Sequence, residues 1–219
     1  MATPAQPVMD VAAATAAMAR DPVLGPFVER VGPVATRRRQ GTSFEALARA
    51  IVFQQLAGAA ASTIHARAVA ALGGRMTAEA ILATPDEPLR VAGLSAAKLA
   101  ALRDLAQKTT DGTVPLRSLG RFDDETIIER LVAVRGIGRW TAEMFLLFQL
   151  RRPDVWPVGD LGVRAGYARL HGLAATPTER EIAPLGDRFR PWRSAAAWYC
   201  WQAVALLPPT RGGAGATEA

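Results

Sequence analysis

The sequence predicts an all-α protein, and three observations indicate this fold class. Half of the 219 residues are hydrophobic, and alanine and leucine outnumber β-branched residues in most segments, which favours helices over strands. Ser, Thr or Asp precedes many of the apolar segments, as at a helix N-cap. No segment alternates with a period of two, and no internal repeat is evident. The length allows one large domain or two interleaved subdomains.

Helix start and stop signals place these helices in order along the chain. Thr42 and Glu45 form a capping box that opens the apolar segment Phe44–Leu72, which ends at two glycines. Residues 1–8 and 209–219 are rich in Pro, Gly and Ala and are expected to be loose ends of a single domain, 9–208. Further helices are predicted after Thr84, from Ser95 to about Lys108, from Asp123 or Asp124, from about Arg139 to Leu150, from Asp160, after Thr176, and over Arg193–Leu207.

The charge composition favours a polyanionic partner. The formal net charge is +6, and the sequence pI is about 10.6. Lys98 and Lys108 are the only lysines among the 26 basic residues, so arginine supplies the rest. Arginine is the better bidentate ligand of phosphate, whereas it cannot act as an amine nucleophile.

Several classes of protein are not expected from the composition. The single cysteine, Cys200, allows no intrachain disulfide and no cysteine-ligated iron–sulfur cluster, and with only His65 and His171 no zinc site is expected. The alanine-rich stretch Val11–Ala19 lacks the basic leader of a signal peptide, and no apolar run is long enough to cross a bilayer. We expect a cytoplasmic monomer that does not bind membranes.

The stretch Leu131–Ala142 predicts a tight turn between two amphipathic helices. Gly136 and Gly138 flank one isoleucine, and arginines flank the glycines. Backbone N–H groups at such a turn and at the start of the second helix can face an anion, which suits DNA binding without base readout. The alternative is a plain helical hairpin whose glycines only relieve steric crowding, and the turn alone favours this alternative.

The stretch resembles the helix-hairpin-helix signature of the DNA glycosylase superfamily, in particular its 3-methyladenine type II branch. Three other segments resemble that branch in the same order, namely Phe44–Ala57, Pro157–Arg164 and Arg190–Trp201. The resemblance implies two helical subdomains with a helix-hairpin-helix motif and a cleft between them. It also implies an enzyme that frees alkylated purines, of the 3-methyladenine and 7-methylguanine type, from double-stranded DNA by base flipping. An N-terminal β-domain of some relatives is missing, so the chain looks like a minimal version.

By this resemblance Asp160 is the catalytic carboxylate. Breaking an N-glycosidic bond builds positive charge on the sugar, and a fixed carboxylate near C1′ stabilises that charge and can orient water. One carboxylate suffices when the leaving base is already cationic, as N3- and N7-alkylated purines are. The alternative for Asp160 is an ordinary N-cap, which its position alone favours, and both roles are compatible.

The resemblance also assigns a base pocket and the absence of lyase activity. Trp140, Met144 and Trp201 match pocket positions that would hold an extruded base between aromatic or apolar walls. Trp198 is expected in the core. Glycosylases that also cleave the backbone use a lysine just after the hairpin to form a Schiff base, and Trp140 occupies that place here. A monofunctional enzyme is therefore expected.

The remaining assignments concern DNA and a cation. A side chain must fill the hole that a flipped base leaves, and Gln55 is the best candidate, with Leu56 as a rival and Gln54 equally explicable as a backbone-bonding residue. The resemblance places hairpin contacts to DNA at Arg135, Gly136, Gly138, Arg139 and Thr141. It gives the backbone carbonyls of Val132, Val134 and Ile137 as ligands of a structural Na⁺ or K⁺, with no other cofactor required.

Two other functions remain open from the sequence. The first is a glycosylase for deaminated or otherwise damaged bases. The second is a hairpin module that binds DNA without catalysis, for which Asp160 and the tryptophans would have no use.

Overall fold

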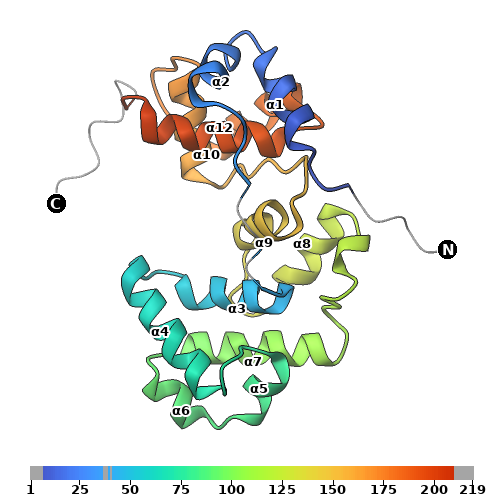
Figure 1. Cartoon of the computed structure of the whole chain (residues 1–219), viewed down its shortest axis with the longest axis vertical. Coiled ribbons are helices and arrows are strands. Elements are labelled where there is room, and N and C mark those ends of the chain that lie inside the picture. The colour runs from blue at the N-terminus through green and yellow to red at the C-terminus, as the bar shows by residue number, and fades with distance from the viewer. Residues whose placement is uncertain (1–6, 37–38, 40, 210–219) are drawn as a thin grey trace. The chain divides into compact units, whose positions relative to one another are not determined.

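The structure is a computed structural model that describes residues 7–36, 39 and 41–209 (Figure 1). These residues form helices joined by turns and loops, without any strand among them, so the predicted all-α class is confirmed. They divide into two compact units. We call residues 39–145 the hairpin unit, and residues 7–36 together with 146–209 the terminal unit. The expected loose ends lie almost wholly outside the described residues.

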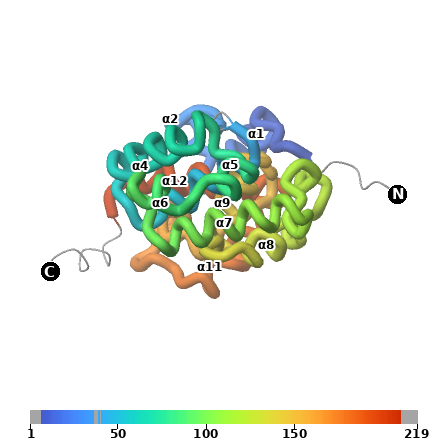
Figure 2. The backbone as a smooth tube through the Cα atoms, turned by 90° about the horizontal axis from the view of Figure 1, so that it is seen from below, coloured from blue at the N-terminus to red at the C-terminus, as the bar shows by residue number. Residues whose placement is uncertain are grey.

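The hairpin unit is built around buried leucines and isoleucines of α3 and α7. Leu47, Ile51 and Leu105 have no exposed surface. Helix α3 contacts α4, α7 and α9, and α5 lies alongside α7 (Figures 1 and 2). The helices of this unit are α3 (Ser43–Phe53), α4 (Gly58–Ala71), α5 (Ala78–Ala83), α6 (Asp86–Val91), α7 (Ala96–Thr110), the 3₁₀ turn η1 (Leu119–Arg121), α8 (Asp124–Val132) and α9 (Arg139–Phe145).

The terminal unit takes its helices from both ends of the described chain. Its core gathers aromatic residues around α12, and the buried Tyr199 hydroxyl donates a hydrogen bond of 2.9 Å to the Gly32 carbonyl. The helices of this unit are α1 (Val11–Ala19), α2 (Gly25–Val31), the π-helix η2 (Leu146–Leu150), α10 (Leu161–Leu170), α11 (Glu179–Leu185), the 3₁₀ turn η3 (Asp187–Phe189) and α12 (Arg193–Leu206).

Helices α10 and α12 meet without intervening side chains at one point. A Cβ atom added to Gly166 would lie 1.9 Å from the backbone oxygen of Cys200, which is far inside van der Waals contact. The glycine therefore lets the two helix backbones touch. Cys200 is fully buried there, as expected for a small apolar residue, and this burial raises the pKa of its thiol.

Most of the predicted helix starts agree with the structure. Thr42 and Glu45 form the complete capping box, and Ser95, Asp123 and Asp160 are N-caps whose side chains accept backbone hydrogen bonds. Two predicted starts are wrong. Helix α6 begins after Pro85 instead of after Thr84, because that threonine ends α5.

The second wrong start concerns α11. Its N-cap is Thr178, not Thr176, because Thr178 and Glu181 make the reciprocal capping box. The two threonines stand in overlapping Thr-x-x-Glu frames, so the sequence pattern alone supports either one.

Two predicted apolar segments are interrupted in the structure. The segment Phe44–Leu72 breaks at Gln54–Ala57 into α3 and α4, and Gln55 adopts a positive φ of 56° at the break. The segment from Arg139 to Leu150 changes from α-helix to π-helix at Leu146, which is also where the chain passes from one unit to the other. π-Helical turns are rare and often lie at functional sites.

Within the described residues, no helix has both the length and the apolar character needed to cross a membrane.

Candidate active site and DNA-binding loops

Hydrogen bonds to Oδ1 hold the side chain of Asp160 in place. It caps the N-terminus of α10, where Oδ1 accepts the Val163 backbone N–H at 2.9 Å. The same Oδ1 accepts the indole Nε1–H of Trp201 at 2.9 Å. Only 9% of Asp160 is exposed. The carboxylate thus lies at the positive end of the α10 dipole. The N-cap interpretation of Asp160 is therefore correct, and it coexists with a second contact that a cap does not require.

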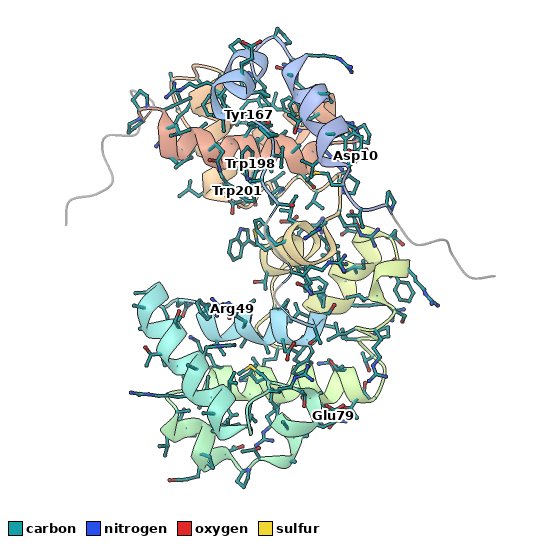
Figure 3. All side chains as sticks on the ribbon, in the orientation of Figure 1. Asp10, Arg49, Glu79, Tyr167, Trp198 and Trp201 are labelled. Carbon is teal, nitrogen blue, oxygen red and sulfur yellow. The ribbon has the colours of Figure 1, made fainter. Side chains whose placement is uncertain are left out.

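Trp201 belongs to an aromatic group on the terminal unit (Figure 3). Its ring stacks on Phe148 of η2, with centroids 5.5 Å apart and planes inclined by 27°. Trp198, three residues earlier on α12, packs edge-on against Tyr199 and is partly buried against the core, in agreement with the expected packing role. A small pocket beside these rings is lined by Leu147, Phe148, Trp198 and Trp201, among others, and holds about 30 Å³, which is enough for water but not for a base.

Gly162 leaves room for the pair formed by Asp160 and Trp201. A Cβ atom at this position would lie 2.8 Å from Cδ1 of Trp201 and 3.0 Å from Oδ1 of Asp160. Any side chain here would push the indole or the carboxylate away. Sequence reasoning missed Gly162 and Phe148 as residues of this site. Two glycines four residues apart inside α10, each costing helix stability, were the available signal of close packing.

The loop Gln54–Leu56 was expected to fill the hole left by a flipped base, and its three residues differ in their contacts. The Gln54 side chain donates from Nε2 to the Gly136 carbonyl at 2.9 Å, so it bonds to backbone, as its alternative interpretation had it. Gln55 and Leu56 are exposed, and 38% of Leu56 is accessible to solvent. These two are therefore the residues of the loop whose side chains are presented at the surface of the hairpin unit.

The predicted hairpin turn is present between α8 and α9. Gly136 has a φ of +78°, which glycine adopts without strain, and an added Cβ would lie 3.3 Å from the Ala101 Cβ. The Arg135 N–H donates to Oδ2 of Asp104 at 2.7 Å, and the Ile137 N–H donates to the Val134 carbonyl at 3.1 Å. Those two N–H groups serve the turn itself, so they are not the ones offered to an anion.

Helix α7 contacts both the end of α3 and the hairpin turn through three residues, each three positions after the last. Lys98 donates from Nζ to the Val52 carbonyl at 2.7 Å, Ala101 faces Gly136, and Asp104 accepts the Arg135 N–H. Residues spaced three apart share one side of a helix. The end of α3 and the hairpin turn are therefore held against the same side of α7.

The charged and hydroxyl residues around the turn differ in how far their side chains are available to bind DNA. Arg135 is exposed, but the Arg139 guanidinium bonds to the Glu125 carboxylate at 2.6 and 2.9 Å and to Glu143 at 3.2 Å. Only 7% of Thr141 is exposed, so its side chain faces the interior. Of the arginines predicted to contact DNA, Arg135 is the one whose guanidinium bonds no carboxylate among the described residues.

The predicted base-pocket residues of the hairpin unit share one face of α9. Trp140 and Met144 are four residues apart, and 49% of Trp140 is exposed, whereas Thr141, Ala142 and Phe145 are buried. Large aromatic side chains are more often buried, so the exposure of Trp140 is unusual.

No group of three or more His, Cys, Asp and Glu side chains comes together as a metal site in the described part of the chain. The three carbonyls predicted to hold a monovalent cation lie on either side of the hairpin turn, and Val134 already accepts one N–H. Arg164 bonds to the Pro177 carbonyl at 3.2 Å, which gives it a structural contact.

Comparisons with known proteins identify the family of this chain. Residues 48–191 match the family described as HhH-GPD superfamily base excision DNA repair protein. A DNA-3-methyladenine glycosylase of Schizosaccharomyces pombe is 39% identical over 171 residues, which cover 77% of this chain and 75% of that protein.

Solved structures of similar proteins share the fold. The structure of a 3-methyladenine DNA glycosylase of S. pombe in complex with abasic DNA has a TM-score of 0.78 and 36% identity, covering 89% of this chain and 97% of the other. A DNA-3-methyladenine glycosidase of Bacillus halodurans has a TM-score of 0.83 and 33% identity, covering 91% and 92% respectively. On the matched family and these relatives, the chain belongs to the helix-hairpin-helix superfamily of base excision DNA repair proteins.

Proposed function

We propose that this protein is a monofunctional DNA glycosylase that hydrolyses the N-glycosidic bond of alkylated purines in double-stranded DNA. The carboxylate of Asp160, fixed by a helix N-terminus and an indole N–H, is the observation that carries the proposal. The relatives' names support an alkylated base as the substrate, since those proteins are named DNA-3-methyladenine glycosylases.

The chemistry needs little beyond a positioned negative charge. The bond between C1′ and the purine nitrogen breaks, and its electron pair leaves with the base, which neutralises the cationic alkylpurine. Positive charge then develops on the deoxyribose, where Asp160 stabilises it. Water adds to C1′ and loses a proton, so the products are the free base and an abasic sugar.

The two N–H groups that donate to Oδ1 orient this carboxylate before substrate binds. Because one oxygen is held by Val163 and Trp201, the plane of the Asp160 carboxylate is set by the fold. A group that is already oriented loses no reorganisation energy in the transition state, which is how fixed charges accelerate reactions.

Substrate binding is proposed to use the aromatic and apolar residues Trp140, Met144 and Trp201 against the extruded base. Alkylated purines are cationic, and a cation gains about 0.5–2 kcal/mol or more over an aromatic ring. Gln55 or Leu56 would fill the hole left in the duplex, because Gln54 is engaged with the hairpin.

The hairpin is proposed to dock on phosphate through Gly136, Gly138 and Arg135. A Na⁺ or K⁺ held by carbonyls of Val132, Val134 and Ile137 fits the chemistry of the site, since neutral oxygen donors suit such hard ions. Its positive charge would add to the attraction for phosphate.

The contacts of both lysines support the absence of lyase activity. Lys98 donates to the Val52 carbonyl, and Lys108 forms an ion pair with Asp104 at 2.7 Å. An amine that forms a Schiff base must be deprotonated and reach C1′. Both amines are committed to contacts within the hairpin unit.

The test is release of free base from duplex DNA treated with a methylating agent. We expect 3-methyladenine and 7-methylguanine to be released, leaving abasic sites whose backbone stays intact until alkali is added. Duplexes containing hypoxanthine or uracil serve as the second substrate set. If the protein frees only those bases, the alkylpurine assignment is wrong, and if it binds duplex but frees no base, the enzymatic proposal fails.

A further inference from the structure

The Arg49 guanidinium lies over an aromatic ring at the end of helix α3. Its Cζ lies 3.6 Å from the centroid of the Phe53 ring, four residues later on the same face of the helix. His65 of α4 meets the same ring edge-on, with centroids 6.0 Å apart. The next residues along the chain are Gln54 and Gln55, so this stack stands directly before the loop proposed to enter the duplex.

The Arg49 guanidinium has no carboxylate or carbonyl partner among the described residues. This distinguishes it from Arg103, Arg188 and Arg193, each of which bonds to an aspartate. Stacking on a ring occupies one face of a guanidinium and leaves the N–H groups at its edge available. An arginine that is held in place, half-exposed and with unused N–H donors can donate hydrogen bonds to an acceptor outside the protein.

Two basic side chains contact residues near the C-terminal end of α3, namely Arg49 at Phe53 and Lys98 at Val52. Lys98 reaches the Val52 carbonyl at the end of α3, and its partners include no carboxylate. Burial, and next the charge of Arg49, lower the pKa of His65, so the imidazole stays neutral near pH 7.

We propose that Arg49, stacked on Phe53, binds a backbone phosphate of the DNA next to the loop Gln54–Leu56. The proposal rests on the proposed function, because it takes the loop as the part of the protein that enters the duplex. Phosphate is the acceptor that a planar guanidinium edge fits best, since two parallel N–H groups can bond two of its oxygens. Phe53 acts as the platform that fixes the orientation of that edge.

The stack gives a second phosphate contact at a different place from the hairpin. Flipping a nucleotide and inserting the loop cost free energy, so contacts with the DNA backbone have to hold the duplex in place. A phosphate held by Arg49 beside the loop would keep the duplex against α3 while Gln55 or Leu56 enters. The contact carries no base preference, so it suits an enzyme that scans all sequences.

The experiment measures the salt dependence of binding to a duplex that contains a tetrahydrofuran abasic analogue. One lost phosphate contact reduces the slope of log K against log salt by about 0.9. We expect Arg49→Gln and Arg49→Met to lose about that amount, and Arg49→Lys to keep the slope. Methionine still covers the Phe53 ring, so Arg49→Met separates the charge from its packing.

Arg117→Gln is the matched control, since Arg117 is exposed and lies by the opposite end of α3, in a pocket with Ser43 and Phe44. We expect its slope to equal that of the wild type. The proposal is overturned if Arg49→Met keeps the wild-type slope, or if the Arg49 and Arg117 variants lose equal amounts.

Base release by the wild type separates this inference from the proposed function. If the wild type frees methylated purines while Arg49→Met binds with an unchanged slope, only the phosphate contact is wrong. If the wild type frees no base, the enzymatic proposal fails, and the slope still reports whether Arg49 contacts DNA.

Discussion

The indole Nε1–H of Trp201 donates a hydrogen bond of 2.9 Å to Oδ1 of Asp160, across 41 residues of sequence. The bond forms because α10 and α12 approach until their backbones touch at Gly166 and Cys200. Trp201 is therefore placed to do more than offer an aromatic face, since it also helps to orient the carboxylate. In the proposed site, this tryptophan would link the recognition of the base to the charge that assists its departure.

Replacing Trp201 by Phe should slow base release while sparing most of the binding. The ring that stacks on Phe148 is kept, and the donor to Asp160 is lost. A hydrogen bond to a charged group contributes about 1.5–3 kcal/mol, so we expect the single-turnover rate to fall about tenfold to a hundredfold. Affinity for an abasic duplex should change by less than threefold. A rate equal to that of the wild type would show that the bond does not matter to the reaction.

Gly162→Ala should damage the same pair from another direction. The new Cβ would lie 2.8 Å from the Trp201 ring, so either the indole or the Asp160 carboxylate has to move. We expect slower base release, although alanine favours the helix by about 0.5–1 kcal/mol. Gly120→Ala is the control, because nothing lies within 4 Å of its added Cβ. Equal rates for both variants would contradict this role of Gly162.

Asp104→Ala should weaken DNA binding without changing the chemical step. Burial would raise the pKa of the Asp104 carboxyl, but hydrogen bonds from Lys108 and from the Arg135 N–H outweigh it and lower the pKa. Removing the carboxylate frees the hairpin turn from α7. We expect a severalfold weaker affinity for duplex DNA in a titration, and an unchanged rate of base release at saturating enzyme. A loss of rate with unchanged affinity would be the contrary result.

Acid should destabilise the terminal unit through His171. Burial, and next the charge of Arg188, lower the pKa of its imidazole below the ordinary value of 6.5. The unfolded state then binds more protons than the folded state, so stability is full above about pH 6.5 and falls as the pH drops below it. His171→Phe keeps the stacking on Tyr167, whose ring centroid is 4.0 Å away, and removes the titration.

We expect thermal melting of His171→Phe to lose less stability between pH 7.5 and 5.5 than the wild type does. The remaining decline would include His65, whose pKa is also lowered. An identical decline in the variant and the wild type would rule His171 out as a source of acid sensitivity.

Local signals predicted much of the fold. The caps at Thr42, Ser95, Asp123 and Asp160 are side chains that bond to backbone within three residues, so the sequence contains both partners of each bond. The break between α3 and α4 has no such local signal, because Gln55 adopts a conformation that usually belongs to glycine.

The sequence predicted part of the site's residues, but not the contacts between them. The family resemblance pointed to Asp160 and Trp201, but their hydrogen bond depends on the packing of two helices. The same holds for Asp104 and Arg135, which lie 31 residues apart and are joined by one hydrogen bond. Gly162 matters for the atoms it lacks, and its spacing from Gly166 signals close packing without indicating that Trp201 and Asp160 are the neighbours.

The most direct test of the catalytic assignment is the single-turnover rate of 7-methylguanine release by Asp160→Asn. Asparagine is as good an N-cap as aspartate, so the start of α10 and the fold should be preserved while the negative charge is removed. We expect the rate to fall at least about a hundredfold, in the range seen when one stabilising group is lost from an active site, with tight binding to an abasic duplex retained. A variant that folds, binds and releases 7-methylguanine at the wild-type rate would contradict the assignment of Asp160.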